Sequence, residues 1–305
     1  MNKVLGLLRA SVNIGQPRLG VELGPSLIYN TGIFSSLANV ELKDFGEIVK
    51  TVGRVPSEKG NLKNLNEFID VTLELKSSVK DMMNSNIDMG LLLGGDHSIS
   101  CGSIMGHFEA SAHETCVIWV DAHSDLNPPN SSLSGNLHGC PVSLICEEVR
   151  KNYHFEETFS SLVPCISAKN IAYIGLRDLD VAEIEILKSL NILHFTAKSV
   201  EELGIRRVME ETFKRLDPSG NKMFHLSFDV DSLDPIYTPS TGTPVEGGLS
   251  LREGIYICNA LSSTNRLKFV DLVEVNPNIG FEVERNRTLQ STLSIIRSLM
   301  GCYYH

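Results

Sequence analysis

The chain has 305 residues, a formal net charge of −10 at pH 7 and an apolar fraction of 42%. A chain of this length can bury a large core, and its acidic balance argues against nucleic acid or an anionic membrane surface as the main partner. No apolar stretch of the sequence approaches the length of a membrane span, and the seven cysteines include no C-x-x-C pair, so we expect reduced thiols. We therefore expect a cytoplasmic protein, with a mitochondrial form left open.

Apolar runs alternate with stretches of helical periodicity along the whole chain. In chain order we predict a strand at 4–8, a helix near 25–30, a strand at 48–52, a helix at 62–83, a strand at 89–93, a helix at 98–110, a strand at 116–120, a helix at 141–149, strands at 171–176 and 192–195 with a helix at 181–190 between them, a helix at 200–216, a strand at 223–228, a helix at 251–262, a strand at 269–275 and a helix at 288–300. The stretch 151–169 is polar and irregular, and we interpret it as a surface excursion. This alternation predicts an α/β fold with a parallel sheet covered by helices. Because no linker-like shift in composition interrupts it, we expect residues 1–305 to form a single domain.

Four of the predicted strands end in polar clusters, which are GGDHS (94–98), DAHSD (121–125), DVDSLDP (229–235) and EVNP (274–277). Ligands of open α/β sheets collect at the carboxyl ends of the strands. Taken singly, each cluster has a plainer explanation, such as a turn in which Ser98 caps the next helix, a solvated loop or a buried histidine. In an extended segment Asp121, His123 and Asp125 would share one face, so we expect their side chains to converge.

The carboxylates of these clusters need a compensating charge. Asp121, Asp125, Asp229 and Asp231 would bring four negative charges to the end of a buried sheet, and no Lys/Arg cluster accompanies them. Each uncompensated charge there costs about several kcal/mol, whereas two divalent cations would balance all four. His97 and His123 add neutral nitrogen ligands. A set rich in oxygen and without thiolate suits Mn²⁺, although Fe, Co, Ni or Zn remain open, and it predicts metal-assisted hydrolysis.

The clusters are parts of longer motifs that occur in this order: GQPRLGVELGP (15–25), LGGDHS (93–98), WVDAHSDLN (119–127), SGNLHG (134–139), GLRDLD (175–180), SFDVDSLDPIYTPSTGTPVEGGL (227–249) and EVNP (274–277). In these motifs the chain resembles the ureohydrolase family and, within it, the arginases. The resemblance implies a three-layer α/β/α domain with a mostly parallel eight-stranded sheet, two Mn²⁺ at its carboxyl edge and assembly as a homotrimer.

The same resemblance implies how the ligands are shared. One metal would be held by His97, Asp121, Asp125 and Asp229, and the other by Asp121, His123, Asp229 and Asp231. A metal-bridging hydroxide would then attack the guanidinium carbon of L-arginine and give L-ornithine and urea.

Three further roles follow from chemistry and resemblance together. Asp125 is suited to hold the hydroxide and take its proton, and Glu274 is suited to pair with the guanidinium. His138 is suited to carry a proton to the departing amine, although a lone loop histidine has no special role about as often. Thr243 would lie near the guanidinium by resemblance.

Recognition of the amino-acid end of the substrate rests on the loop after Asp125. In arginases this loop binds the α-carboxylate, which implicates Asn127, Ser132, Ser134 and Asn136, whereas Asp180 and Glu183 match positions near the α-amino group. Because SGNLHG separates arginases from relatives that act on decarboxylated substrates, we rank L-arginine first. The alternatives are an agmatinase or guanidino-acid hydrolase, and a metal-free binding protein, which the complete ligand set opposes. Histone-deacetylase-like enzymes use one metal, so His97 and Asp125 argue against them.

Overall fold

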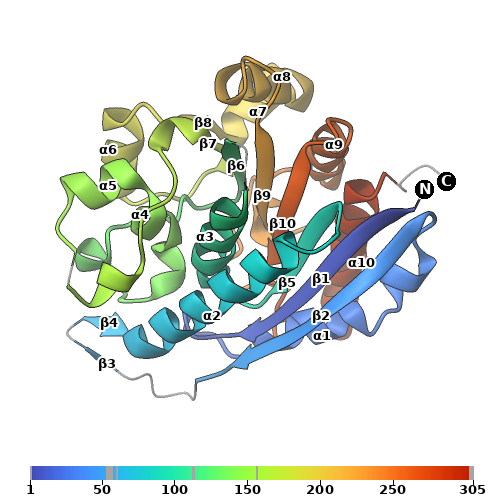
Figure 1. Cartoon of the computed structure of the whole chain (residues 1–305), viewed down its shortest axis with the longest axis horizontal. Coiled ribbons are helices and arrows are strands. Elements are labelled where there is room, and N and C mark those ends of the chain that lie inside the picture. Colours follow the sequence, from blue (N-terminus) through green and yellow to red (C-terminus); the bar gives the residue numbers. More distant parts are fainter. Residues whose placement is uncertain (1, 53–57, 60, 112–113, 156, 302–305) are drawn as a thin grey trace.

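The computed structural model describes residues 2–52, 58–59, 61–111, 114–155 and 157–301. Its main feature is an eight-stranded sheet in the order β2-β1-β5-β10-β9-β6-β7-β8, in which every pair of neighbours is parallel (Figure 1). This confirms the predicted fold class. The strands are β1 Lys3–Val12, β2 Val40–Lys50, β5 Met89–Gly94, β6 Thr115–Val120, β7 Ile171–Leu176, β8 Leu193–Thr196, β9 Met223–Asp229 and β10 Leu267–Val273, with a separate antiparallel pair β3 Glu58–Lys59 and β4 Leu62–Lys63.

Helices cover both faces of the sheet, with α2 and α3 in front of it in Figure 1 and α1 and α10 behind it. Each face has its own apolar core. In β6, Val117 and Trp119 pack into one core and Ile118 and Val120 into the other, which explains the unbroken apolar run. The α-helices are α1 Gly24–Tyr29, α2 Leu65–Met83, α3 Ser100–Ala110, α4 Pro141–Ile145, α5 Glu147–Asn152, α6 Val181–Ser189, α7 Ala197–Leu203, α8 Ile205–Leu216, α9 Leu251–Ser262 and α10 Glu282–Leu299. None of these described helices has the length and apolarity that a bilayer crossing requires.

Two predicted helices are each divided in two. The helix predicted at 200–216 is interrupted at Gly204, whose φ of +78° suits glycine and ends α7 before α8 begins. The helix predicted at 141–149 is interrupted at Cys146, which is extended and forms a β-bridge with Ile166. Periodicity carries on across both breaks, so it does not reveal them.

Several boundaries also differ from the predictions. The second strand was predicted at 48–52 but spans Val40–Lys50, and α2 begins at Leu65 because residues 62–63 form β4. The last helix begins at Glu282, six residues before the predicted start at 288. The stretch 151–169 is irregular, but it is not a plain surface excursion, since Phe159, Leu162 and Ile166 are buried in the core.

The parallel arrangement brings the carboxyl ends of β5, β10, β9, β6 and β7 to neighbouring positions on one edge. All four polar clusters of the sequence follow strands of this group, so they meet at that edge. The turn after β5 is capped by Asp96, whose carboxylate accepts a 3.0 Å hydrogen bond from the backbone N–H of Ser98. The cap is thus Asp96 and not Ser98.

Candidate metal centre

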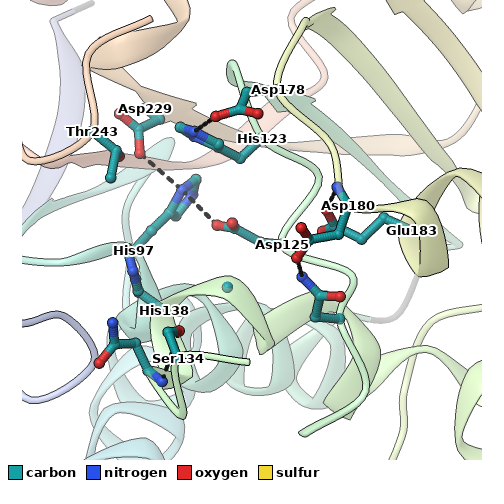
Figure 2. Close-up of a pocket in the computed structure, with 13 residues that line it drawn as sticks. His97, His123, Asp125, Ser134, His138, Asp178, Asp180, Glu183, Asp229 and Thr243 are labelled. Atoms are coloured by element: carbon teal, nitrogen blue, oxygen red, sulfur yellow. Dashed lines mark hydrogen bonds and ion pairs between the residues drawn. The ribbon is translucent and has the colours of Figure 1, made fainter. Parts of the chain in front are cut away.

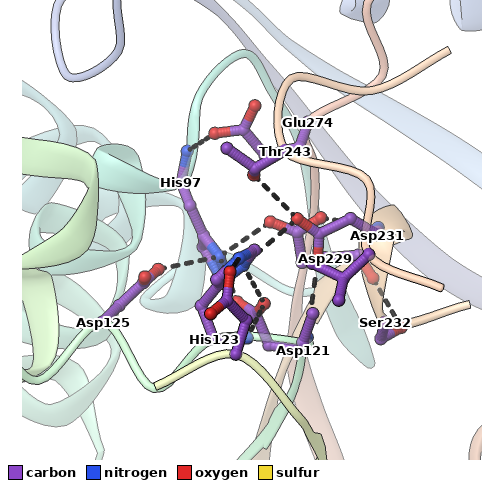
Figure 3. Close-up of polar contacts among 12 residues, drawn as sticks. His97, Asp121, His123, Asp125, Asp229, Asp231, Ser232, Thr243 and Glu274 are labelled. Carbon is purple, nitrogen blue, oxygen red and sulfur yellow. Dashed lines mark hydrogen bonds and ion pairs between the residues drawn. The ribbon is translucent and has the colours of Figure 1, made fainter. Parts of the chain in front are cut away.

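The imidazole of His97 faces three carboxylates at the carboxyl edge of the sheet (Figure 3). Its Nδ1 lies 2.9 Å from Asp121 Oδ2, 3.1 Å from Asp229 Oδ2 and 3.2 Å from Asp125 Oδ2. None of these contacts has hydrogen-bond geometry, and Nδ1 has no other partner among the described residues. A neutral imidazole nitrogen with three carboxylate oxygens around it is the environment of a bound cation.

A second group of ligands adjoins the first and shares Asp121 with it. His123 Nδ1 lies 3.3 Å from both Asp121 Oδ1 and Asp231 Oδ2. Two sets of ligand atoms, each within 4.8 Å of one another, could hold metal ions: one from His97, Asp121 and Asp125, the other from Asp121, His123 and Asp231. The structure therefore brings together all six residues predicted as ligands, Asp229 included. Oxygen-rich donors with two imidazoles fit divalent cations of the Mn²⁺ type.

The carboxylates of this centre are buried, and within the described part of the chain they form no ion pair with a Lys or Arg. Burial and the charge of Asp121 raise the pKa of the Asp125 carboxyl well above its usual value. Burial and the charge of Asp231 do the same for the pKa of Asp229. The concentration of buried negative charge expected from the sequence is thus present, and bound cations would compensate it.

Arg177 is a functional residue that the sequence analysis missed. Its guanidinium donates to the backbone carbonyl oxygens of Asp231 and Val245, each at 2.7 Å, and of Ser232 at 3.1 Å. It therefore holds the segment after β9 by its backbone and leaves the carboxylates free for cations. The motif GLRDLD contains this arginine, but no local pattern shows that its partners are carbonyl groups some 55 residues away.

The ligands of β6 converge for a reason other than the predicted one. The chain bends directly after Val120 and does not continue as an extended strand through Asp125. Asp125 has a left-handed backbone with φ of +50°, and Glu274 has one with φ of +67°. Such conformations are uncommon outside glycine and asparagine and cluster at functional sites. The bend and the left-handed residue, not strand alternation, aim Asp125 at His97.

A cavity of about 360 Å³ opens onto the metal centre (Figure 2). Most of the residues predicted to bind substrate line it, namely Asn127, Ser134, Asn136, Asp180, Glu183 and Thr243, together with the candidate ligands His97, His123, Asp125 and Asp229 and the predicted proton carrier His138. Asp178 also lines it, and its Oδ2 lies 3.7 Å from His123 Nε2; the sequence analysis missed this residue. No Lys or Arg is among the described residues that form the wall.

Ser132 is predicted to bind substrate but is not among the residues that line the cavity. It is buried, and its Oγ accepts a 3.1 Å hydrogen bond from the backbone N–H of Gly135. Gly135 has φ of +69°, and a Cβ there would lie 1.9 Å from the carbonyl oxygen of Asn61, so only glycine fits. Ser132 thus shapes the loop that carries Ser134 and Asn136.

The β3-β4 hairpin supports this loop from outside. Asn61 Nδ2 donates to the carbonyl oxygen of Ser132 at 2.7 Å, and the backbone N–H of Lys63 donates to that of Gly135 at 3.0 Å. The half-buried Lys63 also donates through Nζ to Asn136 Oδ1 at 3.2 Å. This contact turns the amide oxygen of Asn136 toward Lys63 and leaves its N–H groups for other acceptors. Lys63 was not predicted, because it lies far from every motif.

Glu274 connects the metal centre with His138. Its Oε1 accepts a 2.9 Å hydrogen bond from the backbone N–H of His97 and lies 3.6 Å from His138 Nδ1. Its Oε2 is buried without a hydrogen-bond partner among the described groups. Burial favours a neutral His138 ring, but the neighbouring carboxylate of Glu274 outweighs it and raises the pKa of His138. Glu274 is 2% exposed and is not among the residues that line the cavity, so the structure leaves Oε2 without a partner but does not place it on the cavity wall.

Glu183 and Thr243 are both engaged with the protein. Glu183 Oε1 accepts from Ser124 Oγ at 2.6 Å and from the backbone N–H of Leu126 at 3.1 Å, and its Oε2 accepts from the backbone N–H of Asp180 at 2.9 Å. Thr243 Oγ1 donates to Asp231 Oδ2 at 3.0 Å. Glu183 thus joins the loop after β6 to the start of α6, and Thr243 orients a candidate ligand.

Comparisons with known proteins agree with this geometry. The model of the family described as "Arginase family" matches residues 4–302. Arginase-1 of Bos taurus is 42% identical over 308 aligned residues, which cover 97% of this chain and 92% of the bovine protein. The arginase of Entamoeba histolytica, solved in complex with L-ornithine, superposes with a TM-score of 0.85 at 33% identity and 98% coverage of both chains. The Bacillus caldovelox arginase gives a TM-score of 0.87 at 31% identity and 99% coverage of both chains. The chain therefore belongs to the arginase family.

Proposed function

We propose that the protein hydrolyses L-arginine to L-ornithine and urea and uses two Mn²⁺ ions. One observation carries the proposal. The wall of the cavity includes the candidate ligands His97, His123, Asp125 and Asp229. It also includes the amide and hydroxyl groups of Asn127, Ser134 and Asn136, which we call the rim. A guanidinium fits the first set of groups, and the charged α-carboxylate of an amino acid fits the second.

The two metals would share ligands. We assign His97, Asp121, Asp125 and Asp229 to one ion, and Asp121, His123, Asp229 and Asp231 to the other. When bound, such a pair of divalent cations supplies Lewis acidity that lowers the pKa of a water molecule to near neutral. We assign Mn²⁺ because the donor set is rich in oxygen.

Asp125 positions the attacking water, and Glu274 positions the guanidinium group of the substrate. Asp125 points into the cavity and holds the attacking water in line with the guanidinium carbon, and it then accepts a proton from that water. Glu274 binds the guanidinium through its unpartnered Oε2, in a charge-assisted hydrogen bond. Its fixed backbone and its contact with the His97 N–H hold this oxygen in place.

His138 donates a proton to the nitrogen of the departing amine. The C–N bond to ornithine breaks only if the departing nitrogen is protonated, and His138 lines the cavity beside Glu274. Because Glu274 raises the pKa of His138, the protonated form of the ring is favoured, and this form can donate. The proton that Asp125 takes from water is thus balanced by the proton that the ornithine amine receives.

The rim selects for an amino acid. Asn127, Ser134 and Asn136 donate hydrogen bonds to the α-carboxylate, and Asp180 accepts one from the α-ammonium group. Asp180 is also held by Asn127 Nδ2 at 2.8 Å, so the two recognition elements are joined. Glu183 acts on the same end indirectly, since its oxygens hold the loops that carry these groups. Agmatine lacks the α-carboxylate, so an enzyme specific for agmatine would not need these hydrogen-bond donors.

The proposal is tested by urea release from L-arginine, agmatine and guanidinobutyrate, each with chelator-treated protein and after addition of Mn²⁺. We expect Mn²⁺-dependent urea release from L-arginine far above that from the other two. Turnover of agmatine or guanidinobutyrate with none of L-arginine would instead support the runner-up, another ureohydrolase. Protein that binds no metal and releases no urea would be a binding protein. The trimer and the cytoplasmic location implied earlier stay predictions, which sedimentation and cell fractionation test.

A further inference from the structure

Two buried histidines lie behind the metal centre and take no part in the proposed reaction. His107 of α3 is 1% exposed and His225 of β9 is 0% exposed. Their Nδ1 atoms are 3.1 Å apart, so a single proton lies between the rings. Neither residue lines the cavity. Burying two imidazoles that touch each other costs hydration free energy, so their arrangement calls for an explanation.

The pair is connected to the candidate ligand His97 by consecutive hydrogen bonds. His225 Nε2 lies 3.0 Å from Asp271 Oδ2, which is also 3.2 Å from Ser227 Oγ. Ser227 Oγ in turn lies 2.9 Å from His97 Nε2. On the α3 side, Ser103 donates to the same Asp271 oxygen at 2.9 Å, and Ser100 Oγ lies 3.0 Å from Ser227 Oγ.

Sheet geometry puts these groups in a row. His225, Ser227 and Asp229 are alternate residues of β9 and therefore share a face. The register of β9 with β10 sets Asp271 directly beside Ser227. The row thus begins at His225, passes Ser227 and ends at Asp229, which is itself a candidate metal ligand. It is covered by α3, the helix that carries His107.

The direction of each hydrogen bond follows from the one fixed acceptor. Burial would favour a protonated Asp271, but its contact with His225 and its hydrogen bond from Ser103 outweigh it and lower the pKa of this carboxyl. An ionised carboxylate only accepts hydrogen bonds, so the Ser227 hydroxyl donates its one hydrogen bond to Asp271. The Ser227 oxygen then accepts from the N–H at His97 Nε2. That leaves His97 Nδ1 with a lone pair aimed between Asp121, Asp125 and Asp229.

The same reasoning fixes the histidine pair. His225 donates from Nε2 to Asp271, so in its neutral form its Nδ1 accepts, and His107 Nδ1 is the donor. Burial lowers the pKa of His107 well below its usual value, so this ring is neutral. His107 thus leaves His225 only one tautomer, the one that donates to Asp271.

We propose that His107 and His225 are positioning residues for the metal centre, which fix the tautomer and ring orientation of His97 through Asp271 and Ser227. The row of hydrogen bonds reaches His97 and does not reach His123. We therefore expect it to affect the ion held by His97 more than the ion held by His123. It does not depend on which guanidino compound is the substrate. Loss of such an outer partner typically weakens metal affinity by about 10- to 100-fold.

The test compares Mn²⁺-loaded wild-type protein with His225→Leu and His225→Gln. Leucine removes the donor to Asp271, whereas the glutamine amide restores one at the position of Nε2. His194→Leu is the control, because His194 is an exposed histidine of β8 outside this row of hydrogen bonds, and its Nδ1 lies 2.9 Å from the nearby carbonyl oxygen of Ile192. Chelator competition, followed by the electron paramagnetic resonance signal of released Mn²⁺, gives the affinity of each ion. Circular dichroism and Tm report whether each variant is folded.

We expect His225→Leu to weaken one of the two ions by about 10- to 100-fold, with His225→Gln close to wild type and His194→Leu unchanged. Folded His225→Leu protein that keeps both affinities overturns the proposal, and so does equal weakening of both ions. If His225→Leu does not fold, His107→Leu and His107→Asn decide by the same criteria, since asparagine keeps a donor at the position of Nδ1. Wild-type protein that binds no Mn²⁺ would count against the proposed function, a result distinguishable from variants that bind as wild type does.

Discussion

The side-chain amide of Asn127 donates a 2.8 Å hydrogen bond to Asp180 Oδ2 and so ties the loop after β6 to the residue that begins α6. Both residues line the cavity. The bond uses one of the two N–H groups of the amide. The other N–H remains available to a bound anion, and Asp180 remains available to a cation.

Replacing Asn127 by Asp should therefore change substrate choice. The new carboxylate repels both Asp180 and the α-carboxylate of L-arginine, so we expect KM for L-arginine to rise about tenfold or more, the equivalent of one charge-assisted hydrogen bond. Agmatine turnover should not fall. Asn130→Asp is the control, since Asn130 is exposed on the same loop and donates to the carbonyl oxygen of His154. Steady-state urea assays decide, and an unchanged KM for L-arginine would contradict the assignment of the rim.

Lys63→Met tests whether the β3-β4 hairpin contributes to binding. Without the bond from Nζ, the Asn136 amide is free to rotate. We expect KM for L-arginine to rise by about three- to tenfold with kcat little changed, because Lys63 acts on the substrate only through Asn136 and a typical hydrogen bond contributes about 0.5–1.5 kcal/mol. Lys63→Arg, which keeps a donor, should retain most of the affinity. A fall in kcat at constant KM would show that Lys63 acts elsewhere.

His138→Asn should slow the chemical step and spare binding. General acid catalysis typically contributes about 10²- to 10⁴-fold, so kcat should fall by that order while KM and bound metal stay near their wild-type values. His154→Asn is the comparison variant, because His154 is exposed and outside the cavity. The metal content of both proteins is measured beside the kinetics. Loss of Mn²⁺ from His138→Asn would mean that this residue supports the metal centre instead.

The lowered pKa of His107 predicts how the free energy of unfolding depends on pH. Its pKa is lowered in the folded protein, so below about pH 6.5 the unfolded chain binds a proton that the folded chain does not. The free energy of unfolding should therefore fall by about 1.4 kcal/mol for each pH unit below that point on account of this residue. Urea denaturation of chelator-treated protein between pH 7.5 and 5.5 should show a shallower decline for His107→Asn. Parallel curves for the two proteins would rule the effect out.

The sequence reveals much of the fold because the sheet strands are buried on both faces. Runs such as Cys116 to Val120 are unbroken, and their ends coincide with the first charged residues, which locates the carboxyl edge. By contrast, β2 is half-exposed over most of its length and mixes charges with apolar residues, so only its last part was recognised. The break at Gly204 depends on a single left-handed residue within a continuous helical period.

The residues of the candidate site likewise fall into those that the sequence reveals and those that it does not. His97, Asp121 and Asp229 lie at strand ends or within three residues of them, and their shared chemistry makes them visible before any contact is known. Glu183, Arg177 and Ser132 act through hydrogen bonds to backbone groups or neighbouring loops, and no composition or spacing shows such partners. The His107–His225 pair is hidden for the same reason, since one member lies on a helix and the other within a strand.

The position of β10 in the sheet has a consequence for how the protein folds. The last strand of the described sheet lies between β5 and β9, so the centre of the sheet stays open until residues near Leu267–Val273 arrive. The ligands after β5, β6 and β9 then come together late, through contacts between distant parts of the chain that form slowly. A chain still being synthesised on the ribosome therefore has no complete metal centre, and uptake of the ions would report that folding is finished.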